Sequence, residues 1–298
     1  MTATIDTSAG GRVSSLICDG VELLITENED MVKWGLFPMV PFGGRVRDGV
    51  LNFRGWNHEL ALRLPPHALH GTVLDQEWTI VEQSPTMIVM NRELAGEWPF
   101  EGSVTHTIEL TSHAAKFTLS LDAREPQPAQ VGWHPCFRAP KHSHHNFQAM
   151  LQRDISGITT DQRVPVPRRK YDDCFVKPET MPWIQVENVK VEISSDCSHW
   201  VIYNENPDTV SFEPQSGPPN GINSEPYVVM PGKPLVRHMS ITRIWRAVSR
   251  CSLTHRARMR RSAAVRMSFQ VPPTMLRTVP SDGTFDVPVI VAARQISN

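Results

Sequence analysis

The sequence has few of the features that mark membrane, secreted or nucleic-acid-binding proteins. No run of about 18 apolar residues occurs, and residues 1–12 contain no apolar core of the kind that a signal peptide needs. The formal net charge is only -1, with 30 Lys and Arg against 31 Asp and Glu, so no overall positive field attracts nucleic acid or an anionic membrane. We therefore expect a cytoplasmic protein whose partner is a small, mostly neutral molecule. The sequence indicates no particular oligomeric state.

Cysteine is also scarce, and its positions form no pattern. The five cysteines are odd in number, widely separated and without a CxxC pair: Cys18, Cys136, Cys174, Cys197 and Cys251. This distribution fits neither a disulfide framework nor a cysteine-based zinc site. Free thiols suit a reducing compartment, which agrees with the expected cytoplasmic location.

Amphipathic helices are missing too, because no stretch of about 12 residues combines a 3.6-residue apolar period with helix caps. Two-residue alternation is common instead. It occurs in 106–110 and 117–122, on either side of a turn at 111–115, and predicts a hairpin with one buried face. The same alternation returns in 189–193, 200–203 and 210–213. With 25 Pro and 17 Gly spread through the chain, we predict an all-β, largely antiparallel sandwich.

Charge divides the chain near Trp245. Residues 250–298 contain eight Arg and two Asp, about +6, whereas the preceding part has 22 basic and 29 acidic residues, about -7. We therefore predict a polar N-terminal lead at 1–12, one domain at 13–247, and a basic tail at 248–298 outside that domain. The alternative is that the apolar segment 285–293 adds an edge strand to the sandwich.

Glu213 is the first candidate for chemistry. It ends an alternating segment, so Ser211 and Glu213 share one face of a strand while Val210 and Phe212 share the other. Pro214 follows and cannot donate to a strand ladder, so we expect the strand to end there and Glu213 to project from the rim of a sheet. The alternative interpretation is a solvated strand carboxylate.

His134 has a similar setting, because it precedes Pro135 at the end of a strand predicted to start near Gln130. A structural histidine of the core is the alternative interpretation. His70 lies three residues after His67, an odd spacing that directs the two side chains to opposite sides of an extended segment.

Other polar residues are candidates for binding. Arg45 follows a glycine pair, where the backbone permits close approach and a guanidinium could fork onto hydroxyl groups, although such a turn also occurs without a ligand. Asp172, followed by Asp173, could bind hydroxyls or cap a loop. The cluster of His142, His144 and His145 resembles a metal site, but no carboxylate or cysteine completes a recognisable spacing, so we predict no metal there.

Five ordered motifs resemble the aldose 1-epimerase family, particularly its bacterial branch with a proline-rich first motif. They are GLFPMVPFGGRVRDG at 35–49, HALHG at 67–71, GWHPCFR at 132–138, YDDCF at 171–175 and FEPQSGPPNGIN at 212–223. The resemblance runs from about Val13 to Trp245. It implies the galactose mutarotase-like β-supersandwich and an enzyme that interconverts the α and β anomers of a free aldose.

The resemblance also implies roles for individual residues. Glu213 resembles the general base, His134 the general acid at the ring oxygen, and His70 the second active-site histidine. Arg45 and Asp172 match the residues that bind the sugar. Ring opening and reclosure need only proton transfers, which one carboxylate and one histidine can supply, so neither a metal nor a cofactor is expected.

Two departures from the family pattern concern the choice of substrate. Gly44 stands where the family has an asparagine before the binding arginine, and Thr72 stands where a second glycine commonly follows the His-Gly pair. Relatives that act on sugar phosphates clamp the phosphate with basic residues, for which Arg47 and Arg63 are candidates. A hexose-6-phosphate 1-epimerase is therefore one alternative, and a non-catalytic carbohydrate-binding protein on the same fold is the other.

Overall fold

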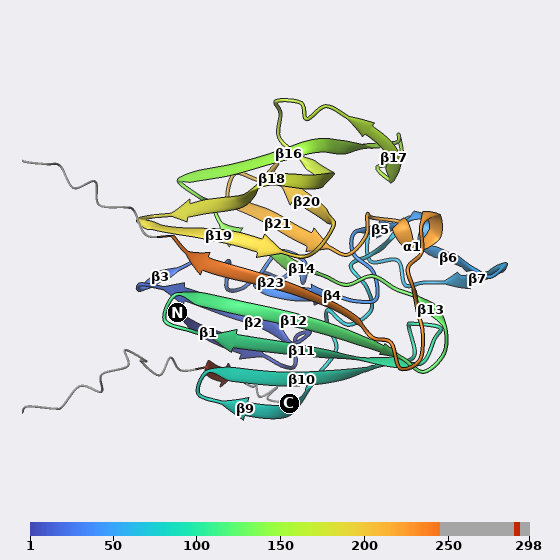
Figure 1. The fold of residues 1–298 in the computed structure, drawn as a ribbon, viewed down its shortest axis with the longest axis horizontal. Helices are drawn as coiled ribbons and strands as arrows, with labels where there is room; N and C mark the ends of the chain where they lie inside the picture. The colour runs from blue at the N-terminus through green and yellow to red at the C-terminus, as the bar shows by residue number, and fades with distance from the viewer. Residues whose placement is uncertain (245–288, 293–298) are drawn as a thin grey trace, which may run out of the picture. The chain divides into compact units, whose positions relative to one another are not determined.

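The computed structural model describes residues 1–244 and 289–292, and the regular secondary structure of these residues is almost entirely β-strand (Figure 1). The predicted all-β, largely antiparallel class is confirmed. The two helices among the described residues are single turns, η1 (Arg47–Gly49) and α1 (Gly221–Ser224). In this part of the chain no helix is long and apolar enough to cross a membrane.

One sheet of 18 strands forms the body of the described fold, and its first half is an antiparallel series. The meander at one end consists of β9 (Thr79–Ser84), β10 (Met87–Leu94), β11 (Gly102–Leu110) and β12 (Ala114–Ala123). Pairing then passes through β23 (Leu235–Arg243), β19 (Val189–Ser195) and β18 (Asp172–Val186). The last of these pairs with β16 (His142–Arg153), which carries β17 (Thr159–Val164), and with β20 (His199–Tyr203).

The second half of the sheet continues from β20. It runs through β21 (Thr209–Gln215), β14 (Gly132–Pro135), β4 (Leu36–Met39), β2 (Arg12–Cys18) and β1 (Thr2–Asp6), all antiparallel. Two short strands attach to it, β15 (Phe137–Arg138) on β21 and β3 (Val21–Glu22) on β2. Small two-stranded sheets pair β5 (Arg45–Val46) with β8 (Ala68–Leu69), β6 (Val50–Phe53) with β7 (Trp56–Glu59), and β13 (Gln127–Pro128) with β22 (Val228–Val229).

Alternating side chains explain the core. In β11 and β12 one face of the hairpin is buried, with Ile108 opposite Phe117 and His106 opposite Leu119 in the register. Figure 1 shows this hairpin beside β10 and β23 in one layer of strands. The hairpin predicted from residues 106–122 is therefore confirmed, because the period of two places every second residue against the core.

The N-terminal boundary differs from the predicted one. Residues 2–6 lie not in a polar lead but in β1, whose partner is β2 and whose Ala3 and Ile5 side chains are buried. Two apolar residues among polar ones are too short a pattern to indicate a strand, and tertiary pairing decides the structure here.

The C-terminal segment contains one described strand, β24 (Val289–Ala292), which pairs in parallel with β1. This is the additional strand that the sequence offered as an alternative. The other residues of the predicted tail, 248–288 and 293–298, lie outside the described residues. The domain boundary at 247 stays a prediction.

Candidate active site

A cavity of about 390 Å³ gathers the predicted site residues. Its lining includes Glu213 from β21, His134 from β14, His70 after β8, Arg45 from β5 and Asp172 from β18. Residues more than 160 positions apart in the sequence thus face one space, because the pairings of β14 with β4 and β21 bring the strands together.

Glu213 occupies the interior of a strand rather than its end. β21 continues through Pro214 to Gln215, since the flanking pairs Glu213 with Val201 and Gln215 with His199 keep the register although proline lacks a donor. Glu213 is 2% exposed, so the prediction that it projects from a sheet rim is wrong. The predicted split of faces is confirmed, because Ser211 and Glu213 line the cavity while Phe212 lies in the core.

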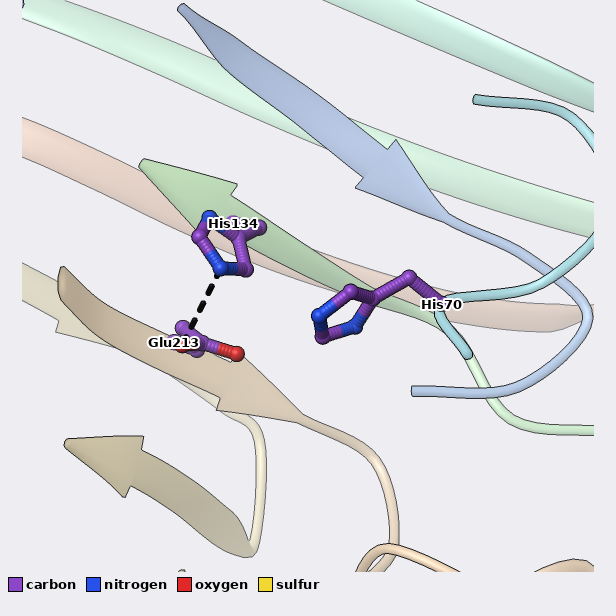
Figure 2. Close-up of side chains that lie close together, drawn as sticks. All are labelled: His70, His134 and Glu213. Carbon is purple, nitrogen blue, oxygen red and sulfur yellow. Dashed lines mark ion pairs between the residues drawn. The ribbon is translucent and has the colours of Figure 1, made fainter. Parts of the chain in front are cut away.

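The carboxylate of Glu213 faces a histidine. Its Oε1 lies 3.4 Å from Nε2 of His134 (Figure 2). Its Oε2 accepts a 3.5 Å hydrogen bond from Gln215. Burial raises the pKa of Glu213 well above its ordinary value, and the nearby negative charge of Asp172 raises it further. Arg45 acts in the opposite direction without cancelling the effect of burial.

His134 is held between other rings. Phe37, its partner across β4 and β14, stacks on it with ring centres 4.8 Å apart and planes 10° apart. His70 meets it edge-on, with centres 4.9 Å apart. Burial lowers the pKa of His134 to about 4, so the ring favours its neutral form at neutral pH.

His70 has a fixed tautomer. Its backbone N–H donates to the Gly44 carbonyl at 3.0 Å, and the Gly44 N–H donates to its Nδ1 at 3.3 Å. Because Nδ1 accepts, the neutral ring carries its proton on Nε2. Figure 2 shows the His70 ring directed toward His134 and Glu213, so this proton is available to a ligand. Burial lowers the pKa of His70 well below its ordinary value.

The next residue, Gly71, makes this arrangement possible. It has φ of 80°, and a Cβ there would lie 2.0 Å from the Val40 carbonyl oxygen, so only glycine fits. His67 faces away, as predicted: its Nδ1 accepts from the Asp48 N–H, and its other nitrogen lies 3.0 Å from the Ser156 carbonyl.

Asp172 receives two guanidinium groups. Arg45 Nη2 lies 2.9 Å from its Oδ2, and the Arg153 guanidinium lies 3.1 Å from the same oxygen. Arg153 also donates to the Asp172 backbone carbonyl and lines the cavity. Sequence analysis missed Arg153, because no motif distinguishes it from other arginines near strand ends. Asp173 is directed elsewhere, with its carboxylate 2.7 Å from Arg169.

Positive charge in and around the cavity is neutralised. Besides Arg45 and Arg153, the lining contains Lys33, which pairs with Asp30 at 2.9 Å. The two arginines considered for a phosphate do not line this cavity: Arg47 pairs with Asp154, and Arg63 pairs with Asp75 and Glu97.

His70, His134 and Glu213 form the one group of possible metal ligands found in residues 1–244, with ligand atoms within 4.8 Å of one another. A metal would require a lone pair on the cavity-facing nitrogen of His70. That atom carries the proton as long as Gly44 donates to Nδ1, so a cation would have to displace this hydrogen bond. The residues fit proton transfer better than metal ligation.

The histidines of β16 do not assemble into a group of this kind. His144 stacks on Trp183 with ring centres 5.7 Å apart, while His145 packs edge-on against Tyr171 at 5.5 Å. The two rings thus contact different aromatic partners. Both contacts suit packing against the sheet.

Comparison with known proteins places the chain in a family. The profile of the aldose 1-epimerase family matches residues 1–242, so the chain belongs to this family of carbohydrate epimerases. A search of curated protein sequences found no match.

Solved structures give the same fold. A putative aldose 1-epimerase from Escherichia coli K12 superimposes with a TM-score of 0.71 at 19% identity, covering 82% of this chain and 97% of that one. A galactose mutarotase-like protein from Clostridium acetobutylicum gives 0.70 at 18% identity, covering 80% and 91%. A galactose 1-epimerase from Lactobacillus acidophilus gives 0.66 at 15% identity, covering 80% and 89%. These likenesses confirm the galactose mutarotase-like fold predicted from the motifs.

Proposed function

We propose that the protein is an aldose 1-epimerase that interconverts the α and β anomers of a free hexose. The observation that carries this proposal is the juxtaposition of Glu213 Oε1 and His134 Nε2, 3.4 Å apart in the wall of a cavity large enough for one sugar. A paired carboxylate and imidazole can remove one proton and deliver another in a single site.

Burial opposes charge on both members of the pair. Burial raises the pKa of Glu213 and lowers that of His134, so the ligand-free site disfavours both the doubly charged and the doubly protonated arrangement. Ring opening requires the doubly charged arrangement, with the proton on His134 and Glu213 as the free carboxylate, so the bound sugar has to stabilise it.

Ring opening then moves two protons. Glu213 takes the proton of the C1 hydroxyl while His134 Nε2 protonates the ring oxygen, so the bond from C1 to the ring oxygen breaks and C1 becomes an aldehyde. Rotation about the bond between C1 and C2 presents the other face of the aldehyde. Reclosure returns one proton to His134 and one from Glu213 to the C1 oxygen, which restores the pair and needs no other reactant.

The other cavity residues hold the sugar. We assign Asp172 as an acceptor for hydroxyl groups, kept in place by Arg45 and Arg153. Arg45 has further donors for sugar oxygens, and His70 donates through Nε2. Fixed donors and acceptors of this kind orient the ring relative to Glu213 and His134.

A free sugar suits the site better than a phosphorylated one. Lys33, Arg45 and Arg153 each contact a carboxylate, and Arg47 and Arg63 lie outside the lining with acidic partners of their own. A phosphate dianion would have to displace one of these carboxylates. The buried Cys18, Cys136, Cys174 and Cys197 are free thiols, which supports a reducing, cytoplasmic setting.

Polarimetry tests the proposal. Fresh α-D-glucose, α-D-galactose and α-D-glucose 6-phosphate are followed with wild-type protein, with the Glu213→Gln variant and without protein. We expect wild type to accelerate mutarotation of a free hexose and Glu213→Gln to lose most of this acceleration. Acceleration with the phosphate alone would favour the 6-phosphate epimerase, and sugar binding without acceleration would favour a non-catalytic binding protein.

A further inference from the structure

Arg12, the first residue of β2, is a charged side chain that the proposed mechanism does not use. It is completely buried, and its four hydrogen bonds all go to backbone carbonyls rather than to a carboxylate. Burial lowers its pKa to about 10, so the guanidinium is still charged at neutral pH. A buried cation is costly unless its donors are satisfied, and here the satisfaction comes from the chain itself.

The hydrogen bonds of Arg12 secure a wall of the cavity. Nη1 donates to the carbonyls of Met31 and Trp34, each at 2.9 Å, and the guanidinium carbon lies 4.1 Å from the Trp34 ring centre. These two residues bracket Val32 and Lys33, which line the cavity. The loop between β3 and β4 is therefore fixed at two points, with the lining residues between them.

A further bond reaches a different segment. Arg12 Nη2 donates to the Leu74 carbonyl at 3.0 Å, four residues after His70. One planar group thus joins the loop of residues 31–34 to the segment that carries His70, and a guanidinium can do this because its donors form a rigid fork.

Arg12 also connects to His134 through an aromatic ring. Its guanidinium carbon lies 5.1 Å from the ring centre of Phe37, the ring that stacks on His134. Phe37 further contacts His70 edge-on, with ring centres 6.0 Å apart. Phe37 therefore lies against both histidines of the site and against the buried cation.

Gly35 leaves room for this side chain. It has φ of 69°, and a Cβ there would lie 2.8 Å from the Val13 carbonyl oxygen and 3.2 Å from Cδ of Arg12. A larger residue at position 35 would therefore crowd both the β2 backbone and Arg12.

We propose that Arg12 is a positioning residue that holds the 31–34 wall and, through Phe37, the ring of His134 in the geometry that proton transfer requires. This inference rests on the proposed epimerase function for its kinetic test, but not for its structural one. Misplacing a catalytic group by about 1 Å can cost about 10²-fold in rate.

The kinetic test compares Arg12→Met and Arg12→Lys with Gln127→Met. Gln127 is a buried polar side chain that bonds to Trp98 and to the Glu101 carbonyl and does not line the cavity, so it is a control for general destabilisation. We expect Arg12→Met to lower kcat about 10- to 100-fold, and Arg12→Lys to retain the fold but not the full kcat, because an ammonium cannot replace the fork. Gln127→Met should lower the melting temperature and leave kcat within about twofold.

A second variant and a second measurement complete the test. Phe37→Leu removes the ring between Arg12 and His134 while leaving the hydrogen bonds to Met31 and Trp34, and it should lower kcat with little change in KM. If Arg12→Met does not fold, Arg12→Lys and Phe37→Leu provide the kinetic result. Arg12 variants with the kcat of Gln127→Met would overturn the proposal.

Hydrogen exchange at residues 31–34 needs no substrate. It should be faster in Arg12→Lys than in Gln127→Met, and equal rates would overturn the role of Arg12 in the wall. If the wild-type protein had no epimerase activity, the proposed function would be refuted, but hydrogen exchange at residues 31–34 would still test the role of Arg12 in the wall.

Discussion

Two buried histidines, His134 and His106, differ in whether their surroundings would allow proton transfer to a ligand. Both lie almost out of contact with solvent, and burial lowers the pKa of His134 to about 4 and that of His106 to about 3. Trp133, next to His134 in β14, donates its indole N–H to His106 Nε2 at 3.2 Å. Two adjacent residues of β14 therefore belong to different environments: Trp133 contacts His106, and His134 is itself the other histidine.

The difference lies in what each ring faces. His106 lies among Trp78, Phe117 and the Trp133 indole, whereas His134 faces a cavity and a carboxylate at 3.4 Å. Burial and a depressed pKa thus mark both residues equally. Only His134 lies in the cavity wall beside a carboxylate that could accept a proton.

The largest expected effect is on activity at the pair. His134→Asn and Glu213→Gln should each lower the epimerisation rate about 10²- to 10⁴-fold, because each removes one proton-transfer group. The melting temperature of Glu213→Gln should stay the same or rise, since glutamine places no desolvated charge in the site. Polarimetry with a circular-dichroism melt measures both, and near-normal rates in folded variants would refute these roles.

The opposite result is expected at His106. His106→Leu leaves the Trp133 indole N–H without its acceptor, which should cost about 1–3 kcal/mol of unfolding free energy. Activity of the folded protein should change by less than about threefold. Urea denaturation gives the stability, and a rate loss comparable to that of His134→Asn would erase the distinction between the two histidines.

Acid should destabilise the protein through the same core histidine. The folded pKa of His106 is about 3 against 6.5 for an ordinary histidine, so below pH 6.5 the unfolded chain binds a proton that the folded chain does not. This group's stabilisation is present above pH 6.5 and is lost toward pH 3, by up to about 1.4 kcal/mol per pH unit. Urea denaturation at several pH values measures this effect. The unfolding free energy of His106→Leu should change less with pH than that of the wild type, and an equal pH dependence would contradict this assignment.

The dependence of the epimerisation rate on pH should report the ionisation of His134 and Glu213. Below about pH 4 both His134 and Glu213 are protonated and no base remains, while above the raised pKa of Glu213 the pair has lost its proton. We expect a bell-shaped dependence of kcat/KM between these limits. A rate that keeps rising with pH far into the alkaline range would indicate that hydroxide or another base does the work.

The smallest effect is expected from shortening the chain after Val248. All five residues assigned to the cavity lie between Arg45 and Glu213, so kinetic constants should be retained. Removing β24 exposes the outer edge of β1, so a modest loss of stability is expected. Expression, melting temperature and polarimetry provide the test. A chain that aggregates would mean that the segment is a structural part of the sheet.

Much of the fold could be predicted from local pattern, since alternation in β11, β12 and β19 reports which residues face the core, whereas β20 and β21 are buried on both faces. The C-terminal end of β21 could not be predicted in this way. Pro214 removes one hydrogen-bond donor, but the neighbouring pairs on β20 keep the strand together, and such cooperation is invisible in a single segment.

The site was predictable where motifs carry it and not where only three-dimensional proximity does. Glu213 and His134 occur in recognisable motifs, and strand pairing places them together. Arg153 and Arg12 have no such signal, because the first owes its position to a pairing of β16 with β18, and the second is identified only by carbonyls from three separate segments. Such partners come together only in the folded structure, so a single segment of sequence does not indicate them.

The two hydrogen bonds between His70 and Gly44 have a consequence for the bookkeeping of hydrogen in the cavity. They fix one proton on His70 Nε2 for as long as that ring is neutral, whereas the proposed mechanism transfers protons at Glu213 and His134. The cavity thus contains a stationary hydrogen and a travelling one. In the proposed mechanism only the moving proton becomes part of the sugar, while the fixed proton on His70 would donate a hydrogen bond to a sugar oxygen.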